Sequence, residues 1–244
     1  LINRLGFNNH GAEIVKERIK RNKKLGLLGI NIGPNKDSSD RLNDYLIGLK
    51  TFYDDADYIT INISSPNTEN LRTFHEGDKL QDLLKSIMAE RKNLKSNIPI
   101  AVKVSPDISE DQVNKISEIL LEYEIKAIIV SNTSEATRDK LSNIQRHQKG
   151  GLSGKPIEEK SNILINKFYK LLKGKIKIIG VGGVDSGQAA YDKFIAGADY
   201  IQLYTGMVFK GPNIVGIIKK DLKELLIRDG VKNYTEIVGN KTLS

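Results

Sequence analysis

The sequence predicts an α/β fold of the (β/α)8 TIM-barrel type, in which parallel strands alternate with helices. Two observations support this prediction. Six short apolar runs each end in a polar or glycine-rich cluster, and the segments between them carry apolar residues at the three- and four-residue spacing of helices. The six expected strands lie at residues 27–31, 58–63, 98–104, 127–130, 176–181 and 200–203.

Several helix starts can be predicted from local residue patterns. Residues 109–112 read Ser-Glu-Asp-Gln, the form of a capping box, and Ser186 is suited to cap the helix that runs to Ala196. Pro156 stands where a first helical turn accepts proline. We therefore expect a helix after each of these positions.

Length and composition are those of one domain, which we expect to span residues 1–244. The chain has 39% hydrophobic residues, enough for a single large core, and it shows no linker, repeat or low-complexity tract. No apolar run approaches the roughly 20 residues that span a bilayer. The absence of cysteine excludes disulfides, thiolate metal sites and a cysteine nucleophile or base.

The net charge of +8 comes from lysines that are interleaved with acidic residues along most helices. Such a pattern favours a solvated surface over a nucleic-acid site, so we expect no nucleic-acid partner. The three histidines, His10, His75 and His147, are isolated and lack metal-ligand spacing. We expect them to be surface residues, and we expect no metal site.

The most informative stretch follows the second expected strand. Residues 61–68 read Ile-Asn-Ile-Ser-Ser-Pro-Asn-Thr, and they offer a hydroxyl for proton transfer and amides for a polar planar ring. Side chains just past the carboxyl end of a parallel strand face the ligand in barrels and open sheets. The alternative is an ordinary turn, for which the same residue types are common.

Later strand ends add groups that suit a phosphorylated ligand. Residues 180–186 form a glycine-rich turn into a helix, and residues 204–206 form a second small turn at the next strand end. Backbone N–H groups of such turns bind phosphate, although glycines also serve plain tight turns. Lys103 lies inside an apolar strand, where it either forms a salt bridge or meets an anionic ligand group. Together with the amide-rich residues 3–9 and 131–133, these groups suit a flat heterocycle beside flavin mononucleotide (FMN).

At this level of detail the chain resembles the quinone-dependent (class 2) dihydroorotate dehydrogenases. The resemblance runs from Asn3 to about Lys219 and rests on ordered motifs at residues 3–9, 29–33, 62–72, 101–103, 131–133, 150–154, 180–185 and 204–206. It implies a (β/α)8 barrel with FMN at the carboxyl ends of the strands.

The resemblance also implies roles for individual residues. Ser65 corresponds to the catalytic base. Substrate contacts are implied for Asn3, Arg4, Leu5, Gly6, Phe7, Asn62, Asn67, Asn132 and Thr133. Flavin contacts are implied for Asn31, Asn62, Lys103, Ser131, Gly154, Gly183, Tyr204 and Thr205. Ser131 replaces a threonine that is typical of the family, and it keeps the hydroxyl group.

The activity implied is the oxidation of dihydroorotate to orotate in pyrimidine biosynthesis, with a quinone as electron acceptor. Ser65 would take a proton from C5 while hydride leaves C6 for flavin N5. Class 1 relatives use cysteine as the base, so Ser65 favours class 2. A class 2 enzyme of a bacterium is expected at the cytoplasmic side of the inner membrane, held peripherally through an N-terminal region.

Six expected strands are two fewer than a closed barrel of this type requires. We therefore expect the first two strands and an N-terminal helical region to be missing, and residues 1–244 alone to bind FMN poorly and to leave quinone unreduced. Two other functions stay open from the residues. One is a phosphate-binding barrel lyase or isomerase, and the other is a non-catalytic protein that keeps the motifs.

Overall fold

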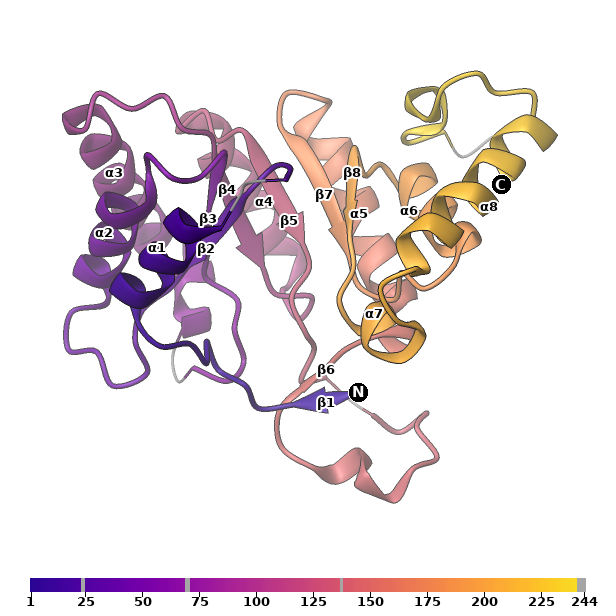
Figure 1. Cartoon of the computed structure of the whole chain (residues 1–244), viewed down its shortest axis with the longest axis horizontal. Coiled ribbons are helices and arrows are strands. Elements are labelled where there is room, and N and C mark those ends of the chain that lie inside the picture. The colour runs from indigo at the N-terminus through magenta and orange to yellow at the C-terminus, as the bar shows by residue number, and fades with distance from the viewer. Residues whose placement is uncertain (23–24, 69–70, 137, 241–244) are drawn as a thin grey trace.

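The protein is described by a computed structural model that covers residues 1–22, 25–68, 71–136 and 138–240. Its centre is a six-stranded parallel sheet with the order β2-β3-β4-β5-β7-β8 (Figure 1). All six predicted strands are confirmed. They are β2 (Gly29–Ile32), β3 (Tyr58–Asn62), β4 (Ile100–Val104), β5 (Ala127–Val130), β7 (Lys177–Val181) and β8 (Tyr200–Gln202).

Helices connect successive strands and cover one face of the sheet (Figure 1). The capping box of Ser109 and the cap of Ser186 on Ala189 N–H are both confirmed. Pro156 lies in a short 3-10 turn, η3 (Lys155–Ile157), directly before its helix. The helices are α1 (Ala12–Arg21), α2 (Arg41–Phe52), α3 (Gly77–Asn93), α4 (Glu110–Glu122), α5 (Glu158–Leu172), α6 (Gly187–Ala196), α7 (Thr205–Lys210) and α8 (Ile214–Arg228).

The two faces of the sheet differ because side chains alternate along each strand. On β4, Ile100, Val102 and Val104 are buried in the main core beneath the helices. Ala101 belongs to a separate small cluster on the opposite face, which we call the inner face, and Lys103 follows it there by the same alternation. The register pairs Lys103 with Asn62 of β3, so two polar side chains meet at the end of the inner face.

The sheet is curled, as expected for barrel strands. The hydroxyl of Tyr58 on β3 is 3.1 Å from Gln202 Nε2 on β8, although β4, β5 and β7 lie between these strands in the sheet order. Only strong curvature brings side chains of β3 and β8 together across the inner face. The fold is thus a curled, six-stranded α/β sheet of the TIM-barrel type.

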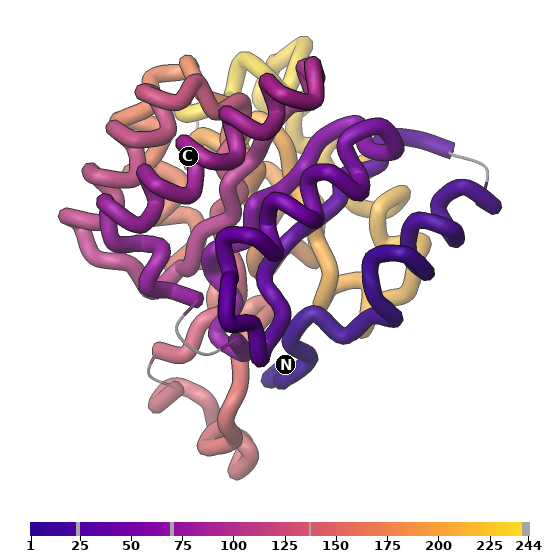
Figure 2. Tube along the Cα trace, turned by 90° about the vertical axis from the view of Figure 1, so that its left-hand side faces the viewer, coloured from indigo at the N-terminus to yellow at the C-terminus, as the bar shows by residue number. Residues whose placement is uncertain are grey.

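A small two-stranded ribbon was not predicted. Strand β1 (Ile2–Asn3) pairs antiparallel with β6 (Gly151–Leu152), and it places Asn3 opposite Gly151. The ribbon lies below the carboxyl ends of the parallel strands in Figure 1, next to the segment 138–150, which projects from the body of the molecule (Figure 2). It brings the start of the chain to the strand ends that bear the predicted site. Among the described residues, no helix is both long and apolar enough to cross a membrane.

The prediction that all three histidines lie at the surface is wrong for His75. Its side chain is 2% exposed, whereas His10 and His147 are exposed as expected. His75 ends the 3-10 turn η1 (Leu71–His75), and its Nδ1 lies 2.8 Å from Arg72 O while Nε2 accepts the Ser105 N–H at 3.2 Å. It therefore joins the segment after β3 to the end of β4 as a neutral ring with the proton on Nδ1.

Burial lowers the pKa of His75 to about 4. The unfolded chain binds a proton on this ring near its ordinary pKa of 6.5, so between these two values acid favours unfolding. From pH 7 to pH 5.5 we expect the free energy of unfolding to fall by about 1 kcal/mol. Aspartate and glutamate side chains ordinarily titrate below pH 5.5, so they contribute little to this change.

Urea titrations of the wild type, His75→Gln and His147→Gln at the two pH values check this expectation. His147→Gln should keep the pH dependence and His75→Gln should lose it. Equal pH dependence in the wild type and His75→Gln would show that another group titrates.

Candidate active site

A cavity of ≈ 450 Å³ lies at the carboxyl ends of the parallel strands, where the sequence predicts the site. Its walls come from the strand ends of β4, β5, β7 and β8, from the β1–β6 ribbon and from η3. The predicted site residues that line it are Asn3, Leu5, Lys103, Ser131, Asn132, Thr133, Gly154, Gly183, Tyr204 and Thr205. The structure thus brings together residues that are up to 202 positions apart in sequence.

One end of the cavity is lined by glycines that leave no room for side chains. Gly183 has φ +81°, and a Cβ there would lie 2.8 Å from the Glu158 Cα. Gly154 has φ +86°, and a Cβ there would lie 2.9 Å from Thr205 Cγ2. The Thr205 hydroxyl donates to Ser153 Oγ at 2.8 Å, which fixes a polar rim beside the glycines. This small, polar end suits a phosphate group.

Lys103 is a charged group in the cavity wall. Among the described residues, no carboxylate pairs with its ammonium group and no acceptor binds it, so these residues do not form the salt bridge considered from the sequence. Burial lowers the pKa of Lys103 below its ordinary value. A buried cation is costly without a partner, so an anionic or electron-rich ligand at this wall would stabilise it.

The amides and hydroxyls of β3 and β5 form one network beside the cavity. Asn132 Nδ2 donates to Ser64 Oγ at 3.0 Å and lies 3.5 Å from Asn62 Oδ1. The Ser64 hydroxyl donates to Asn62 Oδ1 at 2.9 Å, and Tyr45 OH donates to Asn62 O at 2.7 Å. Asn62 and Asn132 are therefore held in fixed orientations at the ends of β3 and β5, which lie on either side of β4.

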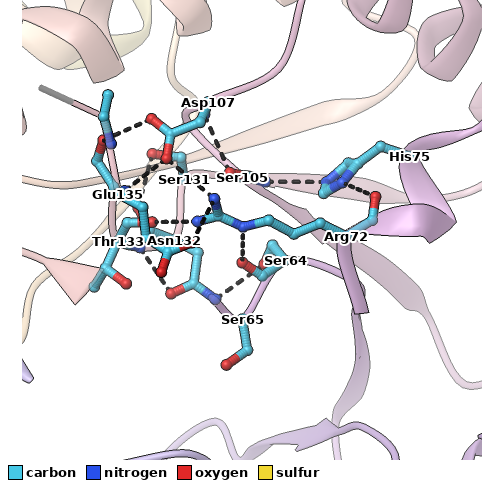
Figure 3. Close-up of polar contacts among 12 residues, drawn as sticks. Ser64, Ser65, Arg72, His75, Ser105, Asp107, Ser131, Asn132, Thr133 and Glu135 are labelled. Atoms are coloured by element: carbon cyan, nitrogen blue, oxygen red, sulfur yellow. Dashed lines mark hydrogen bonds and ion pairs between the residues drawn. The ribbon is translucent and has the colours of Figure 1, made fainter. Parts of the chain in front are cut away.

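The two adjacent serines differ in what their hydroxyls do. Ser64 is fully buried and its hydroxyl is engaged in the network. The Ser65 oxygen accepts the Asn67 N–H at 3.2 Å, and within the described part of the chain its proton has no acceptor. Figure 3 shows the Ser65 side chain pointing away from the polar cluster. Of the two, Ser65 has the hydroxyl that is available for proton transfer.

Three other predicted substrate residues, Asn67, Gly6 and Phe7, lie beside this network. Asn67 Nδ2 donates to Asn3 O at 3.3 Å, which links the Ser65 segment to the cavity wall. A Cβ on Gly6 would lie 3.5 Å from Asn67 O, and one on Gly33 would lie 2.9 Å from the Phe7 ring. Gly6 and Phe7 thus lie beside Asn67 and the end of β2.

Seven predicted residues do not line the cavity. Asn62, Ser65, Asn67, Gly6 and Phe7 lie in or beside the network described above, and Asn31 and Arg4 lie apart from it. Asn31 is exposed on the edge strand β2, opposite Thr60 of β3. Arg4 donates to Lys149 O at 2.6 Å and lines a neighbouring hollow. Their proposed contacts with flavin and substrate stay predictions.

The charged residues around Arg72 form a cluster that the sequence motifs do not predict. The Asp107 carboxylate accepts from Arg72 Nη1 at 3.2 Å (Figure 3). It also accepts from the Ser134 hydroxyl at 2.6 Å and pairs with Lys160. Although burial acts in the opposite direction, hydrogen bonds from Lys160, Ser134 and the Glu135 N–H hold the pKa of Asp107 below its ordinary value. The one signal in the sequence was the residue type of Arg72, since an arginine close to the serine-rich loop needs acceptors or acidic partners.

Fold and site together define an α/β protein of the barrel type with a ligand cavity at the carboxyl ends of its strands. The described residues contain no group of three or more His, Asp or Glu side chains suited to a metal ion. Residues 1–226 match the dihydroorotate dehydrogenase family, and the chain belongs to that family.

Relatives of known name agree with this assignment. The chain is 45% identical over 241 residues to the dihydroorotate dehydrogenase (quinone) of Bartonella tribocorum, covering 97% of this chain and 67% of the relative. It is 44% identical over 230 residues to the protein of the same name from Pasteurella multocida, covering 91% and 68%. The chain thus spans about two thirds of the length of these relatives.

A solved structure has the same fold. It is dihydroorotate dehydrogenase (DHODH) from Eimeria tenella in complex with ferulenol, which is 31% identical and superposes with a TM-score of 0.93 over 99% of this chain and 71% of that one. The expected fold class and family are confirmed.

Proposed function

We propose that the protein oxidises dihydroorotate to orotate, with FMN as its cofactor and a quinone as the final electron acceptor. The names of the relatives support the reaction and the acceptor. The observation that carries the proposal is a cavity whose walls bear ten of the residues implied by the family resemblance, among them Lys103, which has no counter-charge within the described part of the chain.

The residues present fit FMN. Gly154, Gly183, Tyr204 and Thr205 would hold its phosphate, because they form the small, polar end of the cavity. Lys103 and Ser131 would face the ring from the strand ends, with Asn31 and Asn62 as further contacts. When bound, FMN supplies a two-electron carrier that accepts hydride from the substrate.

The chain's own groups then perform the remaining steps. Asn62, Asn67, Asn132 and Thr133 would orient the planar substrate through their amide and hydroxyl groups. Ser65 would take the proton from substrate C5; a serine hydroxyl is a weak base, so water or a neighbouring hydroxyl must accept the proton in turn. Lys103 would stabilise negative charge that develops beside it, a preorganised electrostatic effect.

A quinone acceptor also suggests where the protein works. Membrane quinones are lipid-soluble and dihydroorotate is water-soluble, so an enzyme that uses both acts at a membrane surface. We propose peripheral association with a membrane, in a bacterium the cytoplasmic side of the inner membrane, through a segment that precedes Asn3 in the family.

An assay of the purified complete gene product tests this function. We expect the absorbance spectrum of an oxidised flavin and the formation of orotate from dihydroorotate when a soluble quinone is added. A protein that carries flavin but forms no orotate with any quinone or other acceptor would contradict the proposed reaction. A colourless protein that isomerises or cleaves a phosphorylated substrate would favour the alternative barrel enzyme.

A further inference from the structure

The guanidinium group of Arg72 bridges three strand ends in the candidate active site. Its Nε donates to Ser64 O at 3.4 Å and its Nη2 to Thr133 O at 3.1 Å. Its Nη1 lies 3.2 Å from Asp107 Oδ2 and 3.3 Å from Glu135 Oε2. One side chain thus touches the segments that follow β3, β4 and β5 (Figure 3).

The two carbonyl groups that Arg72 binds belong to the loops with the predicted chemistry. Ser64 directly precedes Ser65, the proposed base. Thr133 and its neighbour Asn132 are proposed substrate contacts. The distance between base and substrate therefore depends on two loops that Arg72 joins through their main chains.

Acidic side chains hold Arg72 in this place. Asp107 accepts the Glu135 N–H at 2.7 Å and the Ser134 hydroxyl at 2.6 Å and pairs with Lys160 of α5, so three groups besides Arg72 fix the carboxylate. The side chain of Asp107 is 15% exposed and that of Arg72 is 26% exposed. Ion pairs at this depth are screened less than surface pairs, and the fork geometry of arginine suits several acceptors at once.

We propose that Arg72 is a positioning residue, which holds the Ser65 loop and the Asn132–Thr133 loop at their working separation. The proposal rests on the proposed function for the identity of the reaction, but the bridge itself does not depend on it. Lysine at this place would keep the charge near Asp107 but could not reach both carbonyl groups in the same way.

The test compares Arg72→Ala, Arg72→Lys and the control Lys167→Met in the complete gene product with its cofactor bound. Lys167 forms a 2.6 Å ion pair with Glu110 that joins α5 to α4 away from the cavity. The measurements are the rate of flavin reduction by dihydroorotate, the affinity for orotate, the melting temperature and amide hydrogen exchange by residue.

For Arg72→Ala we expect the rate to fall by about 10²-fold, as small misplacements of reacting groups can cause, and for Arg72→Lys by about 10-fold. Amide exchange should accelerate locally in residues 62–68 and 131–134, with unchanged exchange in the core strands and in Lys167→Met. Weaker orotate binding should accompany the loss of rate.

If Arg72→Ala does not fold, Arg72→Lys decides the question. Wild-type rate and wild-type exchange in Arg72→Lys would overturn the proposal, as would acceleration spread evenly over the whole chain. If the wild type does not oxidise dihydroorotate, the proposed function fails, while local acceleration in the Arg72 variants would still support the bridge.

Discussion

Replacing Ser65 with alanine is expected to slow flavin reduction by dihydroorotate by about 10² to 10⁴-fold, the usual contribution of a general base. Bound flavin should be retained, because the glycines and Thr205 that form the small polar end of the cavity are untouched. Ser65→Cys should recover part of the rate, since a thiol ionises near pH 8.5 and is a better base. Rapid mixing of each oxidised variant with substrate under anaerobic conditions measures these rates.

Ser64→Ala is the matched comparison for this experiment. It removes a neighbouring hydroxyl that binds Asn132 but leaves the Ser65 hydroxyl in place. Its loss of rate should therefore be much smaller than that of Ser65→Ala. A Ser65→Ala protein with near-normal flavin reduction would remove Ser65 from the mechanism, and the reverse order of effects would assign the base to Ser64.

Replacing Lys103 with methionine is expected to have opposite effects on the fold and on the cofactor. The flavin-free protein should become more stable, because a half-buried ammonium with no counter-charge among the residues that the structure describes is exchanged for an apolar side chain. Flavin should be retained less well, and its reduction should slow by about 10² to 10³-fold, as when one preorganised charge is lost from an active site.

Thermal unfolding of the flavin-free protein, flavin content after dialysis and the rate of flavin reduction measure the three effects. Lys50→Met serves as the control, since Lys50 forms a 3.5 Å ion pair with Glu90 and lies outside the cavity. If Lys103→Met destabilises the flavin-free protein and keeps its flavin, Lys103 has a structural role.

The parallel strands and the cavity wall could be predicted because each depends on local signals. Apolar runs that break into polar or glycine-rich clusters mark a strand and its carboxyl end, and parallel strands place these ends at one edge of the sheet. Lys103 could also be picked out locally, because it lies between Val102 and Val104 in an apolar strand. A lysine in such a strand is expected either to form a salt bridge or to meet an anionic ligand group. That no carboxylate in the described ranges pairs with Lys103 needed the structure, because ion pairs join residues that are distant in sequence.

Other features depend on contacts that no local pattern indicates. The β1–β6 ribbon has only two residues in each strand, too few for a recognisable period. His75 is buried because η1 folds against the end of β4, where the Ser105 N–H finds an acceptor in the imidazole ring. Arg72 and Asp107 are 35 positions apart, and their bridge appears only when three strand ends are brought together.

Anaerobic mixing of the complete, purified gene product with dihydroorotate tests the central claim most directly. We expect the bound flavin to be bleached and one orotate to form per flavin, with the colour restored when quinone is added. Flavin that stays oxidised in the presence of excess dihydroorotate, in a folded protein with full cofactor content, would contradict it.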